Sequence, residues 1–82
     1  MNFHKALGVR VRRARLDVGF KQRELAVLLK MPRSAVSELE HGRRGMSAVE
    51  LFRLCDATAI SAEWFLGLAP SPEKIRLVVH GR

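Results

Sequence analysis

The sequence has a single cysteine, no tyrosine and one tryptophan among its 82 residues. One thiol cannot form an internal disulfide, which excludes the small disulfide-stabilised scaffolds of secreted proteins. The histidines, His4, His41 and His80, are spread too far apart to form a convincing zinc site with one cysteine. We therefore expect no metal and no other cofactor.

Long hydrophobic runs are absent as well. No segment approaches the roughly 20 apolar residues of a membrane-spanning helix, and the N-terminus lacks the apolar stretch of a signal peptide. We expect a cytoplasmic protein with no membrane partner. No Ser/His/Asp or paired-carboxylate arrangement stands out, and so short a chain is poorly suited to hold a catalytic pocket, so we do not expect an enzyme.

Positive charge is the clearest feature that is present. The formal net charge is +7, and residues 1–45 contain eleven Lys and Arg against four Asp and Glu, whereas residues 46–82 contain four of each. Such segregation favours a polyanion such as nucleic acid, although small basic proteins can be simply soluble. Arg10, Arg12 and Arg13 fit a solvated helix face better than direct phosphate contacts.

Apolar residues at helical spacing predict an all-α protein with about five short helices. The expected ranges are 2–17, 21–29, about 33–41, 48–57 and a short helix after Ser61. Gly19, Gly42 and Gly67 are suited to end helices, and Ser47 is suited to begin one. Cys55 is expected in the core, and Trp64 and Phe65 are expected in the core or at a dimer interface rather than in a platform that stacks on bases.

The end of the chain has a different character. A Pro-Ser-Pro segment at 70–72 predicts a linker, and alternation over 74–80 is a weak indication of a strand. We therefore divide the chain into a DNA-binding domain at 1–68 and a linker and tail at 69–82, in which the strand could serve dimerisation.

The second and third predicted helices fit a helix-turn-helix, in which a small residue such as Ala26 lets two short helices cross closely. The apolar stripe of the third helix is narrow, consisting of Val36 and Leu39 with Ala35 beside them. Most of that helix must therefore face something other than the core. The side chains that point away from the stripe are short or polar and could reach base edges: Arg33, Ser34, Ser37 and Glu38.

The spacing of Gln22, Leu25-Ala26, Val36-Ser37 and Glu40-His41-Gly42 resembles the lambda-repressor-like family, also called Cro/CI or XRE-type helix-turn-helix proteins. The likeness extends over about residues 7–66. It implies that the third helix reads bases in the major groove of double-stranded DNA.

The resemblance also implies roles for individual residues. Gln22 would contact a phosphate and brace the recognition helix, and Arg33, Ser34 and Glu38 would read bases with Ser37 beside them. Arg15 and Glu40 would form a salt bridge between the first and third helices. Arg43 and Arg44 would contact the phosphate backbone from the loop after the third helix, and Lys21 would contact a phosphate at the start of the second helix.

Three positions depart from the family pattern. Lys30 replaces the usual glycine of the turn, which would cost about 1 kcal/mol if the backbone there is left-handed. Pro32 replaces the usual Ser or Thr cap of the third helix, with a loss on the order of 1 kcal/mol, and Lys21 replaces a common capping residue of the second. These departures concern the local geometry of the turn more than the fold.

We expect a homodimer on a palindromic operator, with half-sites roughly 34 Å apart, which acts as a repressor and has no small-molecule effector. Two alternatives stay open. The first is an antitoxin that binds a toxin protein, for which the tail could supply a strand, and that also represses its own operon. The second is a small enzyme.

Overall fold

The computed structural model describes residues 2–69, and this part of the chain contains five helices and no strand. Their bounds are α1 (Phe3–Val18), α2 (Gln22–Leu29), α3 (Arg33–Glu40), α4 (Ala48–Thr58) and α5 (Ala62–Phe65). The prediction of an all-α protein with about five helices is confirmed. The predicted linker at 70–72 and strand at 74–80 lie outside the described residues.

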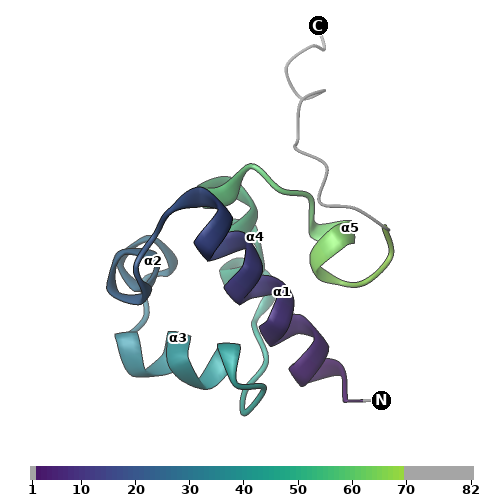
Figure 1. Cartoon of the computed structure of the whole chain (residues 1–82), viewed down its shortest axis with the longest axis horizontal. Coiled ribbons are helices and arrows are strands. Elements are labelled where there is room, and N and C mark those ends of the chain that lie inside the picture. Colours follow the sequence, from purple (N-terminus) through teal and green to yellow (C-terminus); the bar gives the residue numbers. More distant parts are fainter. Residues whose placement is uncertain (1, 70–82) are drawn as a thin grey trace, which may run out of the picture.

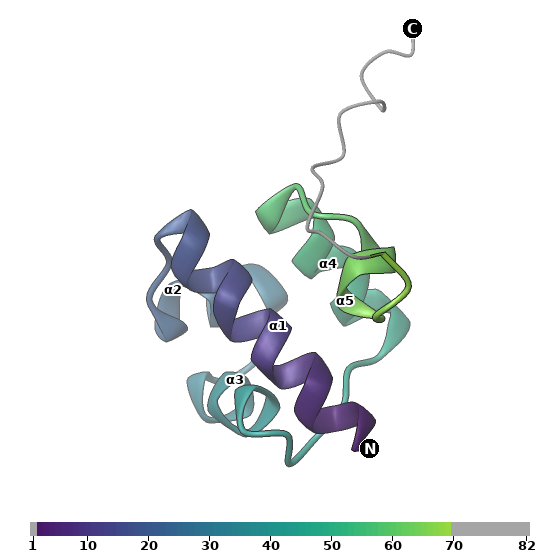
Figure 2. The same cartoon turned by 45° about the vertical axis from the view of Figure 1, so that its right-hand side comes forward.

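Helix α1 is the centre of the arrangement. It packs against α3, α4 and α5, while α2 packs against α3 and α4. Figures 1 and 2 show α1 running across the bundle, with α2 and α3 on one side of it and α5 on the other. None of the described helices is long and apolar enough to cross a membrane.

The helix ends follow the predicted caps. Gly19 ends α1 with a left-handed backbone (φ 94°). Ser47 begins α4, where its hydroxyl accepts from the Glu50 N–H (3.1 Å) and the Glu50 carboxylate accepts from the Ser47 N–H (3.0 Å). The Ser61 hydroxyl accepts from the Trp64 N–H (3.3 Å) at the start of α5.

One apolar core joins all five helices, and Val36 and Leu39 of α3 are fully buried in it. The remaining buried apolar residues are Leu7, Val11, Ala14, Leu25, Ala26, Leu29, Leu54, Cys55, Ile60, Trp64 and Phe65. The core positions expected for Cys55, Trp64 and Phe65 are therefore confirmed. Several large apolar residues of the helices and helix ends are nevertheless exposed: Phe3, Val18, Leu28, Val49, Phe52 and Leu66.

Helices α1 and α3 meet at Gly8, which is buried in α1. A Cβ atom at Gly8 would contact the Leu39 carbonyl oxygen and lie 2.7 Å from the Glu40 carbonyl oxygen, closer than real Cβ atoms come. Only glycine therefore lets the backbones of α1 and α3 approach this closely.

Two residues other than glycine have a left-handed backbone, Lys30 after α2 (φ 58°) and Ala59 after α4 (φ 59°). The turn between α2 and α3 thus keeps the left-handed geometry that the family pattern assigns to glycine. The Lys30 N–H donates to the Val27 carbonyl (3.2 Å) and the Met31 N–H to the Ala26 carbonyl (3.0 Å), so the end of α2 is hydrogen-bonded.

Lys30→Gly and Ala59→Gly are each expected to raise the free energy of unfolding by roughly 0.5–1 kcal/mol, since the steric strain removed exceeds the entropy cost of glycine. Ala57→Gly is the matched control, because it lies two residues earlier inside α4 and should lower stability by about 1 kcal/mol. Urea denaturation measures all three. Equal losses for Ala59→Gly and Ala57→Gly would contradict the strain at Ala59.

Candidate nucleic-acid interface

A buried ion pair attaches the end of α3 to α1. The Arg15 Nε donates to the Glu40 Oε2 (2.6 Å) and the Arg15 Nη2 to the Glu40 Oε1 (3.1 Å). The two side chains are 9% and 2% exposed. The remaining Nη1 of Arg15 donates to the Phe20 carbonyl (2.9 Å), so the guanidinium also holds the turn between α1 and α2.

Gln22, the first residue of α2, completes this cluster. Its Nε2 donates to the Glu40 Oε1 (3.0 Å), and the Glu40 carboxylate thus accepts three hydrogen bonds in all. Such full pairing is what makes a buried charge tolerable in a protein interior. We call Arg15, Gln22 and Glu40 the buried brace, because they join α1, α2 and the end of α3.

The solvent-facing side of α3 carries the four residues assigned to base reading. Arg33 and Ser34 are exposed in the first turn, and Ser37 and Glu38 are half-buried one turn later. The opposite side consists of Val36, Leu39 and Glu40, all buried. The helix therefore presents a free polar face while its other face is fixed by the core and the brace.

Glu38 and Arg43 were assigned different DNA targets, but they contact each other here. The Arg43 Nη1 lies 3.3 Å from the Glu38 Oε2, and both side chains are about half exposed. Exposed pairs of this kind contribute about 0–1 kcal/mol. The contact orders both side chains and opposes their engagement with DNA only weakly.

Arg44 is directed back into the protein. Its Nη2 lies 3.4 Å from the Glu50 Oε2, and its Nη1 lies 3.7 Å from the Met31 sulfur. The pKa of Glu50 is held below its usual value, mainly by the hydrogen bond from the Ser47 N–H; burial opposes this shift, and the Arg44 charge adds to it. Arg44 thus ties the loop after α3 to the start of α4.

Lys21 occupies the exposed cap position of α2, where its side chain cannot accept a hydrogen bond. The Glu24 carboxylate accepts from the Lys21 N–H instead (2.7 Å). The Glu24 N–H, which the usual capping side chain would accept from, donates to the Lys21 carbonyl (3.0 Å), and the Lys21 ammonium group stays available to solvent.

The structure places His4 and Lys5 beside the loop after α3, a position that the sequence did not predict. A Cβ at Gly42 would lie 2.8 Å from the Lys5 Cα, and one at Gly45 would lie 2.7 Å from the His4 Nε2. The loop 42–45 therefore packs directly on the first turn of α1, where both side chains are exposed. The glycines that flank the two loop arginines were the only sequence signal of this contact.

The site contains no recognisable metal centre. Within residues 2–69, no three His, Cys, Asp or Glu side chains lie close enough together to hold a metal ion. The site consists of the polar face of α3 and of cationic side chains beside it. These cations come from α1, from the start of α2 and from the loop after α3.

Comparison with known proteins agrees with this geometry. The sequence profile of the family described as "Helix-turn-helix domain" matches residues 6–63. The chain is similar to the clp gene regulator ClgR from Corynebacterium glutamicum, with 35% identity over 80% of this chain and 70% of that one and a TM-score of 0.75. No curated protein matches the chain.

Two further solved structures extend the likeness. The restriction-modification controller protein C.AhdI from Aeromonas hydrophila is 32% identical over 76% of this chain and 94% of that one, with a TM-score of 0.70. A hypothetical transcription factor, NHTF, from Neisseria is 23% identical over 99% of this chain and 86% of that one, with a TM-score of 0.73. At this identity the likeness shows only that the two chains share a fold.

Glu40→Ala is expected to lower the free energy of unfolding by about 3–5 kcal/mol, because it leaves the Arg15 guanidinium buried without its partner. The double variant Arg15→Met/Glu40→Met should be more stable than Glu40→Ala, since no buried charge remains. Asp17→Ala is the control: it removes the exposed Arg13–Asp17 pair (3.8 Å) and should cost less than about 1 kcal/mol. A loss for Glu40→Ala no larger than that for Asp17→Ala would contradict the brace.

The lowered pKa of Glu50 sets the sign of a pH effect. A carboxyl group whose pKa is lower in the folded state stabilises the fold above its unfolded pKa, and this contribution is lost as pH falls through the folded pKa. Glu50→Gln should therefore flatten the acid side of the stability profile. Thermal unfolding between neutral and strongly acidic pH measures it, and parallel profiles for the two proteins would contradict the assignment.

Proposed function

Since this chain belongs to the helix-turn-helix family of DNA-binding transcription regulators, in its lambda-repressor-like (XRE-type) branch, we propose that it binds one specific sequence in double-stranded DNA as a homodimer and represses transcription there. The family is one of regulators and not of enzymes. A DNA target of this kind supports a location in the bacterial cytoplasm, which is part of the proposal.

The observation that carries the proposal is the free polar face of α3, fixed from behind by the buried brace. The exposed Arg33 can donate two hydrogen bonds to a guanine, and Glu38 can accept one from a cytosine amino group once it leaves Arg43. Ser34 and Ser37 lie on the same face with short hydroxyl side chains. These four residues are the proposed base readers.

Phosphate contacts supply most of the affinity in this proposal. Arg43, Lys21 and Lys5 place cations at solvent-exposed positions near the end of α3, and the exposed His4 lies next to Lys5. Gln22 lies at the start of α2, where backbone N–H groups also favour a phosphate. Each phosphate contact releases counterions, so binding weakens steeply as salt increases. Arg44 acts mainly by holding the loop to α4 through Glu50.

Dimerisation is supported by apolar side chains on α4 that the core does not cover. Val49 is 55% exposed and Phe52 is 71% exposed, and their spacing of three residues puts them on one face of the helix. Covering this face with a second copy would pair two recognition helices across a twofold axis. The matching DNA is a palindrome with half-sites roughly 34 Å apart.

Repression follows most simply from occupancy of a promoter. The relatives named above are described as a gene regulator and a controller protein, which supports a regulatory role for this chain. The alternative role as an antitoxin depends on the sequence at 74–80, and no described residue favours it.

Selection of binding sites from random duplex DNA tests the proposal. We expect one enriched palindromic motif, found at two salt concentrations, with lower affinity at the higher one. Enrichment of no motif at either concentration would contradict specific binding. Sedimentation of the complex with the selected duplex gives the stoichiometry, and one chain per palindrome would contradict the dimer.

Arg33→Ala and Lys5→Gln form a matched pair that separates the two kinds of contact. Arg33→Ala should cost about 1–3 kcal/mol of binding and relax the preference at one base position. Lys5→Gln should weaken binding to all sequences alike and reduce the salt slope by about 1. Fluorescence anisotropy on the selected duplex and its single-base variants measures both, and a uniform loss for Arg33→Ala would contradict base reading.

A further inference from the structure

The outer side of α1 combines exposed apolar and basic residues and has no role in the proposed DNA contacts. Val9 is 66% exposed and Leu16 is 52% exposed, and their spacing of seven residues puts them on one face of the helix. Arg12 and Arg13 lie between them. We call this surface the α1 outer face and include in it Ala6, Val9, Arg10, Arg12, Arg13 and Leu16.

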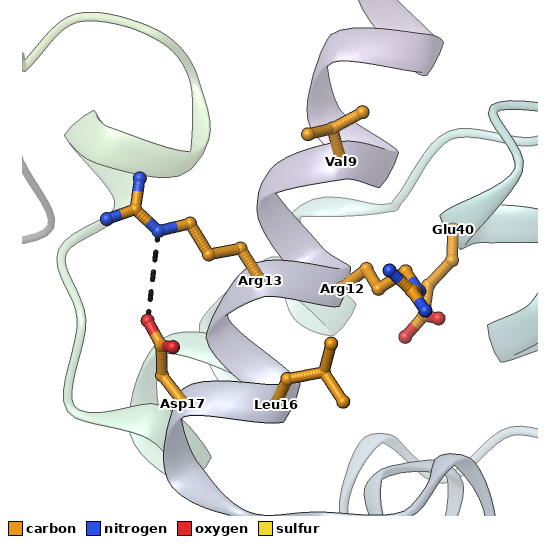
Figure 3. Close-up of a pocket in the computed structure, with 6 residues that line it drawn as sticks. All are labelled: Val9, Arg12, Arg13, Leu16, Asp17 and Glu40. Carbon is orange, nitrogen blue, oxygen red and sulfur yellow. Dashed lines mark ion pairs between the residues drawn. The ribbon is translucent and has the colours of Figure 1, made fainter.

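Two shallow grooves follow this face. One, of about 360 Å³, is lined by Val9, Leu16 and the arginines between them and reaches Asp17 and Glu40. Figure 3 shows Val9, Leu16 and Arg13 projecting from α1 around it, with Arg13 extended toward Asp17. The second groove, of about 370 Å³, runs from Ala6 and Val9 to Trp64. Arg13 borders both grooves, so they form one continuous surface.

The arginines on the Trp64 side are held in place by the aromatic ring. The guanidinium carbons of Arg10 and Arg13 lie 5.8 and 5.7 Å from the centre of the Trp64 ring. Arg12 and Arg13 are exposed, which agrees with the solvated helix face expected for them, and Arg10 and Arg13 lie over the Trp64 ring in addition. A packed guanidinium loses less conformational freedom when it meets a carboxylate than a freely moving one does.

The charge of this face selects its partner. Two acidic residues line the grooves: Glu40, which is already paired with Arg15, and Asp17, which lies 3.8 Å from Arg13. The same grooves contain three arginines, Arg10, Arg12 and Arg13, so the face carries an excess of positive charge. A second copy would bring the same arginines against each other, and like charges oppose that contact. DNA offers charge but no apolar surface to cover Val9 and Leu16. None of the residues proposed to contact DNA lines either groove.

We propose that the α1 outer face docks an amphipathic helix of another protein, whose apolar stripe covers Val9 and Leu16 and whose flanking acidic residues pair with Arg10, Arg12 and Arg13. This mode of recognition lays the apolar side of a helix into a groove, with charges on the rim. The docking goes beyond DNA binding and leaves α3 and its neighbouring cations free.

The test uses two synthetic peptides with the same composition. The first is a helical peptide with leucines at i, i+3 and i+7 flanked by glutamates, and the second has these residues scrambled so that no apolar stripe forms. The first should bind at least about tenfold tighter, because only it covers apolar surface while it pairs charge. Amide NMR shifts of the labelled protein should change along α1 and near Trp64.

Variants locate the site independently of the peptides. Val9→Ser/Leu16→Ser and Arg12→Gln/Arg13→Gln should each weaken the first peptide about tenfold, while affinity for the selected DNA duplex stays unchanged. Val27→Ser and Arg23→Gln are the matched controls, since Val27 is 75% exposed on α2 and Arg23 is exposed beside it. Neither control should change peptide binding.

Three results would overturn the docking proposal. They are equal affinity for the two peptides, NMR changes confined to α3 and the loop 42–45, and self-association of the protein that Val9→Ser/Leu16→Ser abolishes. Equal affinity, or NMR changes at α3 and the loop alone, would mean that a basic surface attracts the acidic peptides without a specific docking site. Self-association that the variant abolishes would mean that a second copy of the chain covers the α1 outer face. Failure to select a DNA motif would affect the proposed function and leave this test intact.

Discussion

The contact between Arg15 and Glu40 fixes the position of the recognition helix. Two charges taken out of water gain little net stability, because the desolvation penalty consumes much of their attraction. Their main effect is to fix the position of α3. The Glu40 carboxylate accepts from Arg15 and Gln22 together, so a shift of α3 relative to α1 or α2 would break one of these hydrogen bonds. The brace therefore sets how the polar face of α3 is presented, while Val36 and Leu39 supply the apolar anchor.

Helix α1 serves a different purpose along each of its sides. Its buried side carries Arg15 and also Gly8, whose missing side chain lets α3 come close enough for the ion pair to form. Its first turn places His4 and Lys5 against the loop that follows α3 and so adds the Lys5 cation to the proposed DNA-binding surface. Its outer side leaves Val9 and Leu16 exposed, and this is the surface proposed to dock a protein partner. The same helix therefore takes part in the proposed base reading, phosphate contacts and protein docking.

Much of this fold could be predicted from local signals, because caps and helical spacing are local. Gly19, Ser47 and Ser61 act where they were expected, and the predicted end of α4 is one residue short of Thr58. The left-handed Ala59 had no such signal, because nothing in its residue type demands that backbone. Phe3 and Phe52 lie in helices that apolar spacing predicts, yet both are exposed, because periodicity locates a helix but does not say how wide a face the core covers. The approach of loop 42–45 to α1 joins residues nearly forty positions apart and could not be predicted from spacing.

The central claim is that α3, held by the buried brace, distinguishes one DNA sequence from others. The most direct measurement compares amide NMR shifts of the labelled protein bound to its selected duplex and to an unrelated duplex of equal length. The amide shifts of residues 4–5, 21 and 43, which lie at the proposed phosphate contacts, should change with both duplexes, because phosphate contacts are independent of sequence. The changes seen only with the selected duplex should concentrate at residues 33–38. Differences spread evenly over the chain, or centred on the outer side of α1, would contradict the claim.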